Sequence, residues 1–338
     1  MYSFAIGIGT RNSKGDWLEV YFPQPVFRPS ADFMDEVAPV LGYAGGNINI
    51  DLDDAALAKL ADAISDDAQS ALARACIGGS KPVVATLLEG DNALTSTPEA
   101  YLKLHLLSHR YVVPNEQNLE GIYALLPNVA WTNLGAMEIE DVTLAQIEAR
   151  KRGEVLDVQA IDKFPKMTNY VTPSGVRIAH SGRVRLGAYL GEGTTVMHEG
   201  FVNFNAGANG PNMIEGRVSQ GVMVDSGSDL GGSASTAGTL SGGGNLVITI
   251  GKDCLISANA GTGISLGDRC TIEAGLYITP GTVVQVLDEH KSLVHEVKAR
   301  ELSGGSDMLF IRNSQTGVVE CRSNARAISL NDALHAHN

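Results

Sequence analysis

The sequence predicts a mainly β protein whose centre is a parallel β-helix, with an α+β domain before it and a small extension after it. Two observations support this prediction. Glycine is abundant, at 38 of 338 residues, and it is concentrated between positions 175 and 282. Within that segment an aliphatic residue returns at every sixth position, a period that belongs neither to an α-helix nor to an ordinary strand. Each hexapeptide of this kind forms a short strand and a corner, and three of them complete a triangular coil.

The hexapeptide phase is continuous at first and then restarts three times. The inward positions of the first run are Ile178, Val184, Leu190, Val196 and Val202. Later runs cover 218–230, 250–256 and 266–284, so the phase breaks at 203–217, 236–249 and 259–265. The first two breaks contain NAGANGPN and TLSGGGN, whose turn-forming residues predict loops that leave the solenoid. Loops on a rigid scaffold are a common place for binding chemistry.

The residues before the β-helix have no period of six and read as an α+β domain. Strands are predicted in YSFAIGIG, WLEVYFP and PVVATLL, and amphipathic helical spacing covers 56–75. A second helix is predicted to open with Thr97 as its N-cap, Pro98 at the first helical position and Glu99 in the first turn.

The residues after the β-helix predict further strands, in EHKSLVHEVKAREL and DMLFIRNSQTGVVECRS, and a short helix in the tail ISLNDALHAHN. We therefore expect an α+β N-terminal domain at 1–165, the β-helix at 166–285, and C-terminal strands with a short helix at 286–338.

Charge and composition exclude several classes of protein. Lys and Arg number 25 and Asp and Glu 38, giving a net charge of −13, which argues against a nucleic-acid or anionic membrane surface. No apolar run reaches the length of about 18 residues that a membrane span needs, and the N-terminus does not resemble a signal peptide. The four cysteines are dispersed and predict neither a zinc site nor a disulfide framework. We expect a cytoplasmic protein.

The histidines give weak signals for a metal. His105 and His109 have the i, i+4 spacing of a helical metal pair, but no HExxH pattern accompanies them, and a structural role is favoured. His180 and His198 lie 18 residues apart, or one full coil, and are expected to stack on one edge. A catalytic zinc ion would need three protein ligands.

Carboxylates near the predicted loops are better candidates for chemistry. Glu199, Glu215 and Glu273 are of this kind, and Glu215 has the best case because it follows the first predicted loop and lies two residues before Arg217. A carboxylate and a guanidinium at one site can serve as proton acceptor and anion clamp. Lys298 and Arg312 are basic residues in an acidic chain that could approach a phosphate or a carboxylate.

Several long segments resemble one known family. VRLGAYLGEGTTVMHEGFVNFNAG, MIEGRVS, LGGSASTAGTLSGGGN and SLGDRCTIEAGLYITPGT are similar to segments of tetrahydrodipicolinate N-succinyltransferases, and the resemblance covers nearly the whole chain. It implies a homotrimer of left-handed β-helices that transfers succinyl from succinyl-CoA to the amine of 2-amino-6-oxopimelate, the opened form of tetrahydrodipicolinate. That reaction belongs to diaminopimelate and lysine biosynthesis.

The resemblance also implies site residues. Glu215, in MIEGRVS, corresponds to the catalytic carboxylate, acting either as a general base or through an acyl-anhydride. The implied acyl-CoA contacts are Arg217, Gly232, Ser235, Ala258, Glu273, Ala274, Gly281, Lys298, Ile311, Arg312, Asn313 and Ser314. Some members hold Mg²⁺ through a Glu and an Asp one coil earlier. Glu199 matches the first position, but Gly182 stands at the second, so Glu199 remains the one candidate metal ligand.

Two other functions stay open at this point. One is a different CoA-dependent acyltransferase of the hexapeptide class, such as an acetyltransferase, and a comparison of acyl donors separates it from a succinyltransferase. The other is a non-catalytic β-helical scaffold, which would leave a CoA thioester undepleted in the presence of an amine acceptor.

Overall fold

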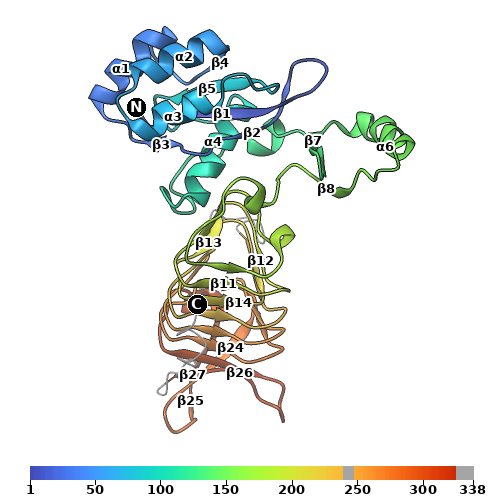
Figure 1. Cartoon of the computed structure of the whole chain (residues 1–338). Coiled ribbons are helices and arrows are strands. Elements are labelled where there is room, and N and C mark those ends of the chain that lie inside the picture. Colours follow the sequence, from blue (N-terminus) through green and yellow to red (C-terminus); the bar gives the residue numbers. More distant parts are fainter. Residues whose placement is uncertain (239–246, 325–338) are drawn as a thin grey trace. The chain divides into compact units, whose positions relative to one another are not determined.

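The structure is a computed structural model and describes residues 1–238 and 247–324. These residues form two compact units (Figure 1). The first comprises Met1–Leu106, Gln117–Pro165 and Asn169–Val171, and the second comprises Leu107–Glu116, Lys166–Thr168 and the described residues from Thr172 onward. No helix in these described ranges is long and apolar enough to cross a membrane.

The first unit is built on an antiparallel sheet with strand order β2-β1-β5-β4, and β3 pairs with β1. Its strands are β1 (Ser3–Arg11), β2 (Trp17–Tyr21), β3 (Val26–Phe27), β4 (Ile48–Leu52) and β5 (Val83–Leu88). Helices α1 (Ala31–Leu41), α2 (Asp54–Ala63) and α3 (Asp67–Ala75) share a hydrophobic core with this sheet, which includes Phe4, Ile6 and Leu60. The three strands predicted in this part of the sequence are confirmed as β1, β2 and β5.

Two helix predictions need correction. The amphipathic stretch 56–75 is not one helix, because Asp66 starts a new one by accepting a hydrogen bond from Gln69 N at 2.9 Å. The helix predicted to follow Thr97 is present as α4 (Thr97–Ser108), but its cap is one residue earlier. Ser96 Oγ accepts the bond from Glu99 N at 3.4 Å, so Thr97 is not the N-cap.

The remainder of the first unit contains a smaller antiparallel sheet with strand order β7-β6-β8. It consists of β6 (Val129–Thr132), β7 (Gly135–Met137) and β8 (Val158–Asp162), with helices α5 (Ile122–Leu125) and α6 (Val142–Lys151) in the same part of the chain. The buried Lys103 ammonium on α4 donates to Asp91 Oδ1 at 2.6 Å and to the Asn92 and Asn118 carbonyls at 2.7 and 2.6 Å. These three bonds fix the loops beside α4.

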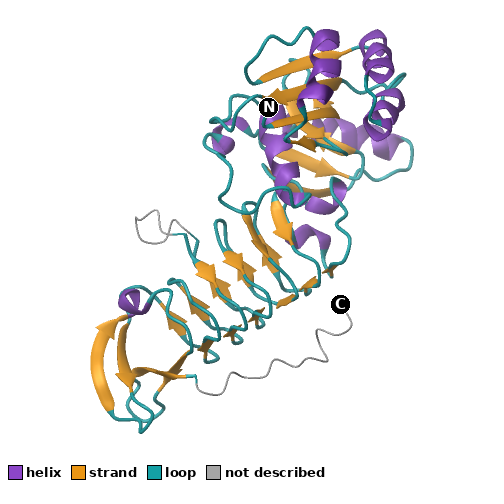
Figure 2. Cartoon of the chain, turned by 90° about the vertical axis from the view of Figure 1, so that its left-hand side faces the viewer, coloured by secondary structure: helices purple, strands orange, loops and turns teal. Residues whose placement is uncertain are grey.

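The second unit is a left-handed parallel β-helix whose coils stack three sheets (Figure 2). The first sheet contains β9 (Arg177–Ile178), β11 (Thr194–Val196), β14 (Asn212–Ile214), β17 (Asp229–Leu230), β20 (Leu255–Ile256) and β22 (Thr271–Ile272). The second contains β12 (Phe201–Val202), β15 (Arg217–Val218), β18 (Ser235–Thr236), β21 (Gly261–Thr262) and β23 (Tyr277–Ile278). The third contains β10 (Ala188–Leu190), β13 (Ala206–Ala208), β16 (Met223–Val224) and β19 (Thr249–Ile250).

The first sheet continues into a C-terminal cap on the β-helix. This cap consists of β24 (Val283–Leu287), β25 (Leu293–Lys298), β26 (Met308–Arg312) and β27 (Val319–Ser323). The strands expected after the β-helix are therefore present, whereas the tail expected to form a helix lies outside the described residues. The short 3₁₀ helices of the chain are η1 (Ile139–Asp141), η2 (Met167–Asn169), η3 (Ser181–Arg183) and η4 (Ala299–Leu302).

The coils differ in length, which explains the breaks in the hexapeptide phase. Ile178 pairs with Val196 and Val196 with Ile214, each 18 residues along the chain. Ile214 then pairs with Leu230 after only 16 residues, and Leu230 with Ile256 after 26. The inward side chains still stack on one another, because each change in length falls within a corner.

The first predicted loop does not exist. The segment 203–217 contains β13 and β14, and the fully buried Ala208 holds the inward position between Leu190 and Val224. The phase continues to Ile214 and slips only at the next corner. Likewise, the phase within 259–265 continues to Thr262 before it slips. The slip predicted at 236–249 is present, but TLSGGGN lies outside the described residues.

Candidate active site

The sequence-predicted site residues lie mostly along one edge of the β-helix. On each coil a first-sheet strand ends in a corner that leads to the second sheet, and we call this line of stacked corners the corner line. Glu215, Gly232, Ala258 and Glu273 occupy it on four successive coils, with Ala274 beside Glu273. Backbone hydrogen bonds join the coils, including Glu215 N to Leu230 O at 2.8 Å. Successive coils are about 4.8 Å apart.

Glu215 lies at the shortest of these corners and not after a loop. Its partly buried carboxylate faces the next coil, where an added Cβ on Gly232 would lie 3.6 Å from Glu215 Oε2. The following Gly216 makes the tight corner, since a Cβ there would lie 2.5 Å from Ala234 O. Glu215 therefore sits at a tight corner, and Gly232 lies opposite its carboxylate on the next coil.

Arg217 and Ser235 are one coil apart on the outer face of the second sheet, where they are register partners. Arg217 Nε donates to Ser235 Oγ at 3.4 Å, and the side chain of Arg217 is exposed. The sequence placed Glu215 and Arg217 in one site. Among the described residues no ion pair joins them, and the guanidinium leans along the coils toward Ser235.

The far end of the corner line is formed by the β26–β27 hairpin, which carries Ile311, Arg312, Asn313 and Ser314. Glu273 Oε2 accepts a hydrogen bond from Arg312 N at 2.8 Å, so the predicted contact Glu273 holds the start of this hairpin turn. Asn313 Nδ2 donates to Glu320 Oε1 at 2.7 Å, and the Asn313 amide and the Arg322 guanidinium hold the pKa of Glu320 below its usual value. Ser314 is exposed.

Gly281 and Lys298 meet at the base of the β24–β25 hairpin. Lys298 pairs with Val283, and the next residue, Ala299, donates its N–H to Thr282 O at 2.8 Å. A hollow of about 640 Å³ lies here, lined by Lys298, Arg300 and four neighbours. Val284 and Arg312 are both register partners of Val319, which places this base two strands from Arg312.

The candidate metal ligand, Glu199, lies on the corner line one coil before Glu215. Its Oε2 is 3.2 Å from the Arg183 guanidinium, so the carboxylate already has a cationic partner. A Cβ on Gly182 would lie 3.1 Å from His180 Cε1, so the missing second carboxylate could not enter without displacing that ring. Among the described residues no three His, Cys, Asp or Glu side chains gather as a metal site, and Mg²⁺ is not supported.

The histidine predictions are confirmed where the structure describes them. The rings of His180 and His198 are 5.4 Å apart in an edge-to-face arrangement, as their spacing of one coil predicts. His105 is fully buried, and its Nε2 accepts from Phe22 N at 3.2 Å while Nδ1 lies 2.7 Å from Tyr101 O. Both ring nitrogens of His105 are thus used within the fold, and burial lowers the pKa of His109.

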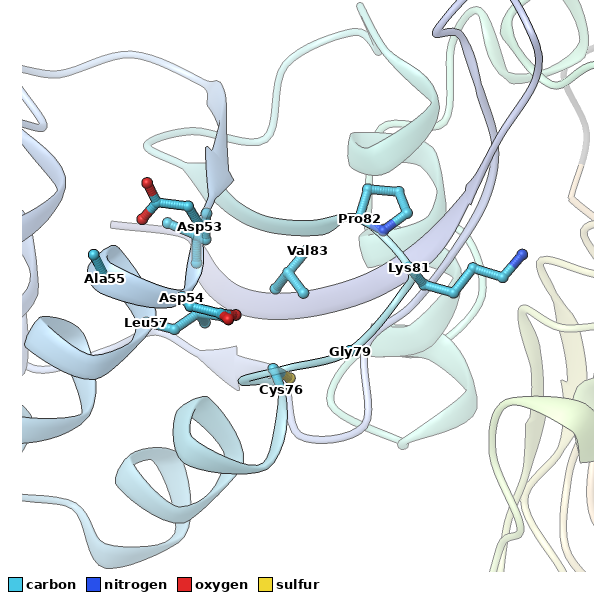
Figure 3. Close-up of a pocket in the computed structure, with 10 residues that line it drawn as sticks. Asp53, Asp54, Ala55, Leu57, Cys76, Gly79, Lys81, Pro82 and Val83 are labelled. Carbon is cyan, nitrogen blue, oxygen red and sulfur yellow. The ribbon is translucent and has the colours of Figure 1, made fainter.

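A separate hollow of about 460 Å³ lies in the first unit, between the start of α2 and the loop after α3 (Figure 3). Its polar groups are already used by the fold: Asp53 caps α2, and Asp54 Oδ1 accepts from Gly78 N at 3.0 Å. Burial raises the pKa of the Cys76 thiol, which makes it a poor nucleophile. We do not assign chemistry to this hollow.

Sequence reasoning missed two neighbours of the site. The row that contains Arg217 and Ser235 continues, in register, to Gly261 and Tyr277. The signal that finds them is the position just before each inward residue of the second sheet. The insertion between Ser235 and Gly261 hides this signal from a search at a fixed spacing.

Comparisons with known proteins agree with the geometry. The family model "Hexapeptide repeat of succinyl-transferase" matches residues 247–280, and "Tetrahydrodipicolinate N-succinyltransferase middle" matches residues 126–166. The chain is 62% identical over 340 residues to the 2,3,4,5-tetrahydropyridine-2,6-dicarboxylate N-succinyltransferase of Pseudomonas putida, covering 100% of this chain and 99% of that protein. It is 50% identical over 343 residues to that of Vibrio cholerae, with both chains covered in full.

A solved structure agrees as well. The crystal structure of a Campylobacter jejuni protein, described as a 2,3,4,5-tetrahydropyridine-2-carboxylate N-succinyltransferase, matches with a TM-score of 0.88 at 28% identity. The match covers 96% of this chain and 93% of the Campylobacter chain.

Proposed function

The chain belongs to the 2,3,4,5-tetrahydropyridine-2,6-dicarboxylate N-succinyltransferase family, and we propose that Glu215 is its catalytic carboxylate. The enzyme is a transferase of lysine and diaminopimelate biosynthesis that moves a succinyl group from succinyl-CoA to the amine of 2-amino-6-oxopimelate. The observation that supports the role of Glu215 is its place on the corner line, with Gly232 opposite its carboxylate on the next coil.

The role of Glu215 in the reaction is that of a general base. The acceptor nitrogen attacks the thioester carbon, the new C–N bond forms, and the C–S bond breaks to release CoA. The proton lost by the nitrogen passes to the Glu215 carboxylate. Holding the amine and thioester together on a rigid edge supplies much of the rate enhancement, and a positioned base adds about 10²–10⁴-fold.

The acyl-CoA is expected to lie along the corner line. Gly232, Ala258 and Ala274 present little more than backbone, so an extended arm can approach closely. Arg312 follows four coils after Glu215, a rise of about 19 Å. Its guanidinium and the Lys298 ammonium suit the phosphates of CoA at that end. Ser235, Glu273, Gly281, Ile311, Asn313 and Ser314 complete the proposed contacts.

Arg217 is the proposed partner of the succinyl carboxylate. This group distinguishes succinyl-CoA from acetyl-CoA, and a site that encloses it must supply a cation or several N–H donors. Arg217 lies two residues from Glu215 and extends over the outer face of the second sheet, where it contacts Ser235. The acyl group of a bound donor would then end beside the guanidinium.

The assembly is proposed to be a homotrimer in the cytoplasm. The four cysteines are free thiols in the structure, as expected in a reducing compartment. Three-fold packing of β-helices would cover their outer faces. Light scattering should give a mass near three times 35.6 kDa, and a stable monomer at micromolar concentration would contradict the trimer.

The deciding experiment measures thiol release from succinyl-CoA and acetyl-CoA with tetrahydrodipicolinate as acceptor. Strong preference for succinyl-CoA is expected. Equal use of both donors would favour an acetyltransferase of the same class, and no release from either would favour a scaffold. Glu215→Gln should lose at least about a hundredfold in kcat, while Glu289→Gln, an exposed carboxylate in the β24–β25 turn, should retain activity.

The proposed roles of Arg217 and Lys298 can be distinguished by comparing succinyl-CoA with acetyl-CoA as donors. Arg217→Ala should narrow the preference for succinyl-CoA, because only that donor carries the carboxylate. Lys298→Ala should weaken both donors by a similar factor, because both carry the same CoA. If Arg217→Ala lowers kcat/KM equally for both donors, Arg217 does not bind the succinyl carboxylate.

A further inference from the structure

The outer face of the second sheet carries an aromatic side chain, Tyr277, to which the proposed reaction gives no role. Tyr277 is the register partner of Gly261, one coil earlier, and its ring leans back over that glycine. A Cβ on Gly261 would lie 2.3 Å from Tyr277 Cε2 and 2.5 Å from Cδ2. The ring therefore rests directly on the backbone of the preceding coil.

Glycine at this position is explained by two close contacts, the Tyr277 ring and Ser235 O, which would lie 2.7 Å from the added Cβ. Gly261 is a strand residue of β21 and does not adopt the positive φ that favours glycine. Gly263, on the same coil, has Pro280 Cδ 3.2 Å from the position of an added Cβ. The outer face of this coil is consequently flat, and Tyr277 covers one part of it.

The position of the ring along the β-helix indicates what it would contact. Gly261 lies three residues after Ala258, two coils after Glu215 and two coils before Arg312. That level is about 10 Å from Glu215, or half of the proposed path of the donor. The ring is thus too far from Glu215 for the acyl group and too far from Arg312 for the phosphates.

We propose that the exposed face of Tyr277 binds the pantetheine arm of the acyl-CoA, which rests on the proposed function of this edge. Tyr277 is 44% exposed, yet its ring rests on the Gly261 backbone, so little conformational entropy is lost when a ligand covers it. The arm alternates methylene groups with amides, and both pack well on an aromatic face. Tyr277 is then a binding residue for every donor that contains the arm.

Donors of three lengths test this assignment. Succinyl-CoA contains the whole arm and the nucleotide, succinyl-pantetheine contains the arm alone, and succinyl-N-acetylcysteamine lacks most of the arm. Tyr277→Ala should lower kcat/KM about tenfold for the first two donors, mainly through KM. It should leave the third donor unchanged, and Tyr277→Phe should behave like the wild type with all three.

Two further variants extend the test. Gly261→Ala should lower kcat/KM for the same two donors because its Cβ displaces the ring, and it should also lower the urea midpoint because that Cβ would lie 2.7 Å from Ser235 O. Tyr111→Ala is the matched control, since Tyr111 is 46% exposed and lies in the same unit away from the corner line. Light scattering should find the same mass for all variants, and a change of mass in Tyr277→Ala would assign the ring to subunit contact instead.

Other outcomes would also overturn the assignment. An unchanged kcat/KM for succinyl-CoA in Tyr277→Ala would remove the ring from donor binding. A loss with succinyl-CoA but not with succinyl-pantetheine would place the nucleotide on the ring. If the wild type turns over no donor, the proposed function is wrong, but the binding role of Tyr277 is still testable. Calorimetry with free pantetheine would then show whether Tyr277→Ala weakens binding.

Discussion

Gly216→Ala should lower the stability of the protein, whereas Gly232→Ala should keep the stability and lower the activity. Both glycines lie on the corner line, one coil apart, and neither has a positive φ. At Gly216 the new Cβ would lie 2.5 Å from Ala234 O, and that oxygen is fixed because Arg217 N donates to it at 2.8 Å. At Gly232 the nearest atom is Glu215 Oε2, at an ordinary 3.6 Å.

These distances set the expected magnitudes. Gly216→Ala forces two coils apart, and overpacking of this kind lowers the free energy of unfolding by about 1–3 kcal/mol. For a unit of this size each kcal/mol lowers Tm by about 2–4 °C. Gly232→Ala meets no such contact and restricts the unfolded chain, so its stability should be unchanged or higher by about 0.4–1 kcal/mol. Its methyl group, however, occupies the space in front of the Glu215 carboxylate.

The assay combines urea unfolding with succinyl-CoA kinetics for both variants. Gly216→Ala should show a lower urea midpoint, while Gly232→Ala should keep the midpoint and lose at least about tenfold in kcat/KM. Equal stability of the two variants would refute the steric reasoning at Gly216. Wild-type kinetics in Gly232→Ala would refute the assignment of this coil to the donor.

Three further outcomes follow from groups outside the corner line. Lys103→Met should lower the free energy of unfolding by about 3 kcal/mol in urea denaturation, because the Asp91 carboxylate and two carbonyls lose a buried ammonium; a wild-type midpoint would contradict this. Burial raises the pKa of Glu19 above 4.5, although the Tyr170 hydroxyl opposes the shift, so the folded state keeps a proton that the unfolded chain loses. Stability should therefore fall as pH rises from 4.5 through the folded pKa, and Glu19→Gln should remove that slope in unfolding measured from pH 4 to 8. A thiol reagent should label the half-buried Cys76 first and the three buried cysteines only on unfolding, which mass spectrometry of the native protein would check.

The β-helix was predictable because its inward positions are filled by large aliphatic residues at a fixed spacing. The prediction was wrong at 203–217, where the inward residue of β13 is Ala208 and the turn-forming residues around it resemble a loop. In the structure this small side chain is fully buried between Leu190 and Val224, which fill the space around it. Stacking between coils therefore determines that β13 is a strand, although the sequence of β13 alone does not indicate one.

The α+β unit shows a different limit. Strand β5 was recognisable because all its residues except Thr86 are apolar. The division between α2 and α3 is set by the extended backbone at Ile64 and by the N-cap bond from Gln69 N to Asp66 Oδ1. Apolar spacing continues across that division, so periodicity alone joins the two helices. The site residues themselves were placed by resemblance, and only the stacking of coils explains why Glu215, Gly232 and Ala258 lie in one line.

The short corner between Ile214 and Val218, which interrupts the hexapeptide phase, also accounts for the position of Glu215. Five residues separate the inward Val196 from Val202, but only three separate Ile214 from Val218. A corner with fewer residues takes a shorter path between the same two sheets than the corners on either side. Gly216 permits this path because no Cβ opposes the next coil. The shortened corner thus places Glu215 between two longer corners, where its side chain is partly buried, as we propose for a carboxylate that serves a thioester and an amine.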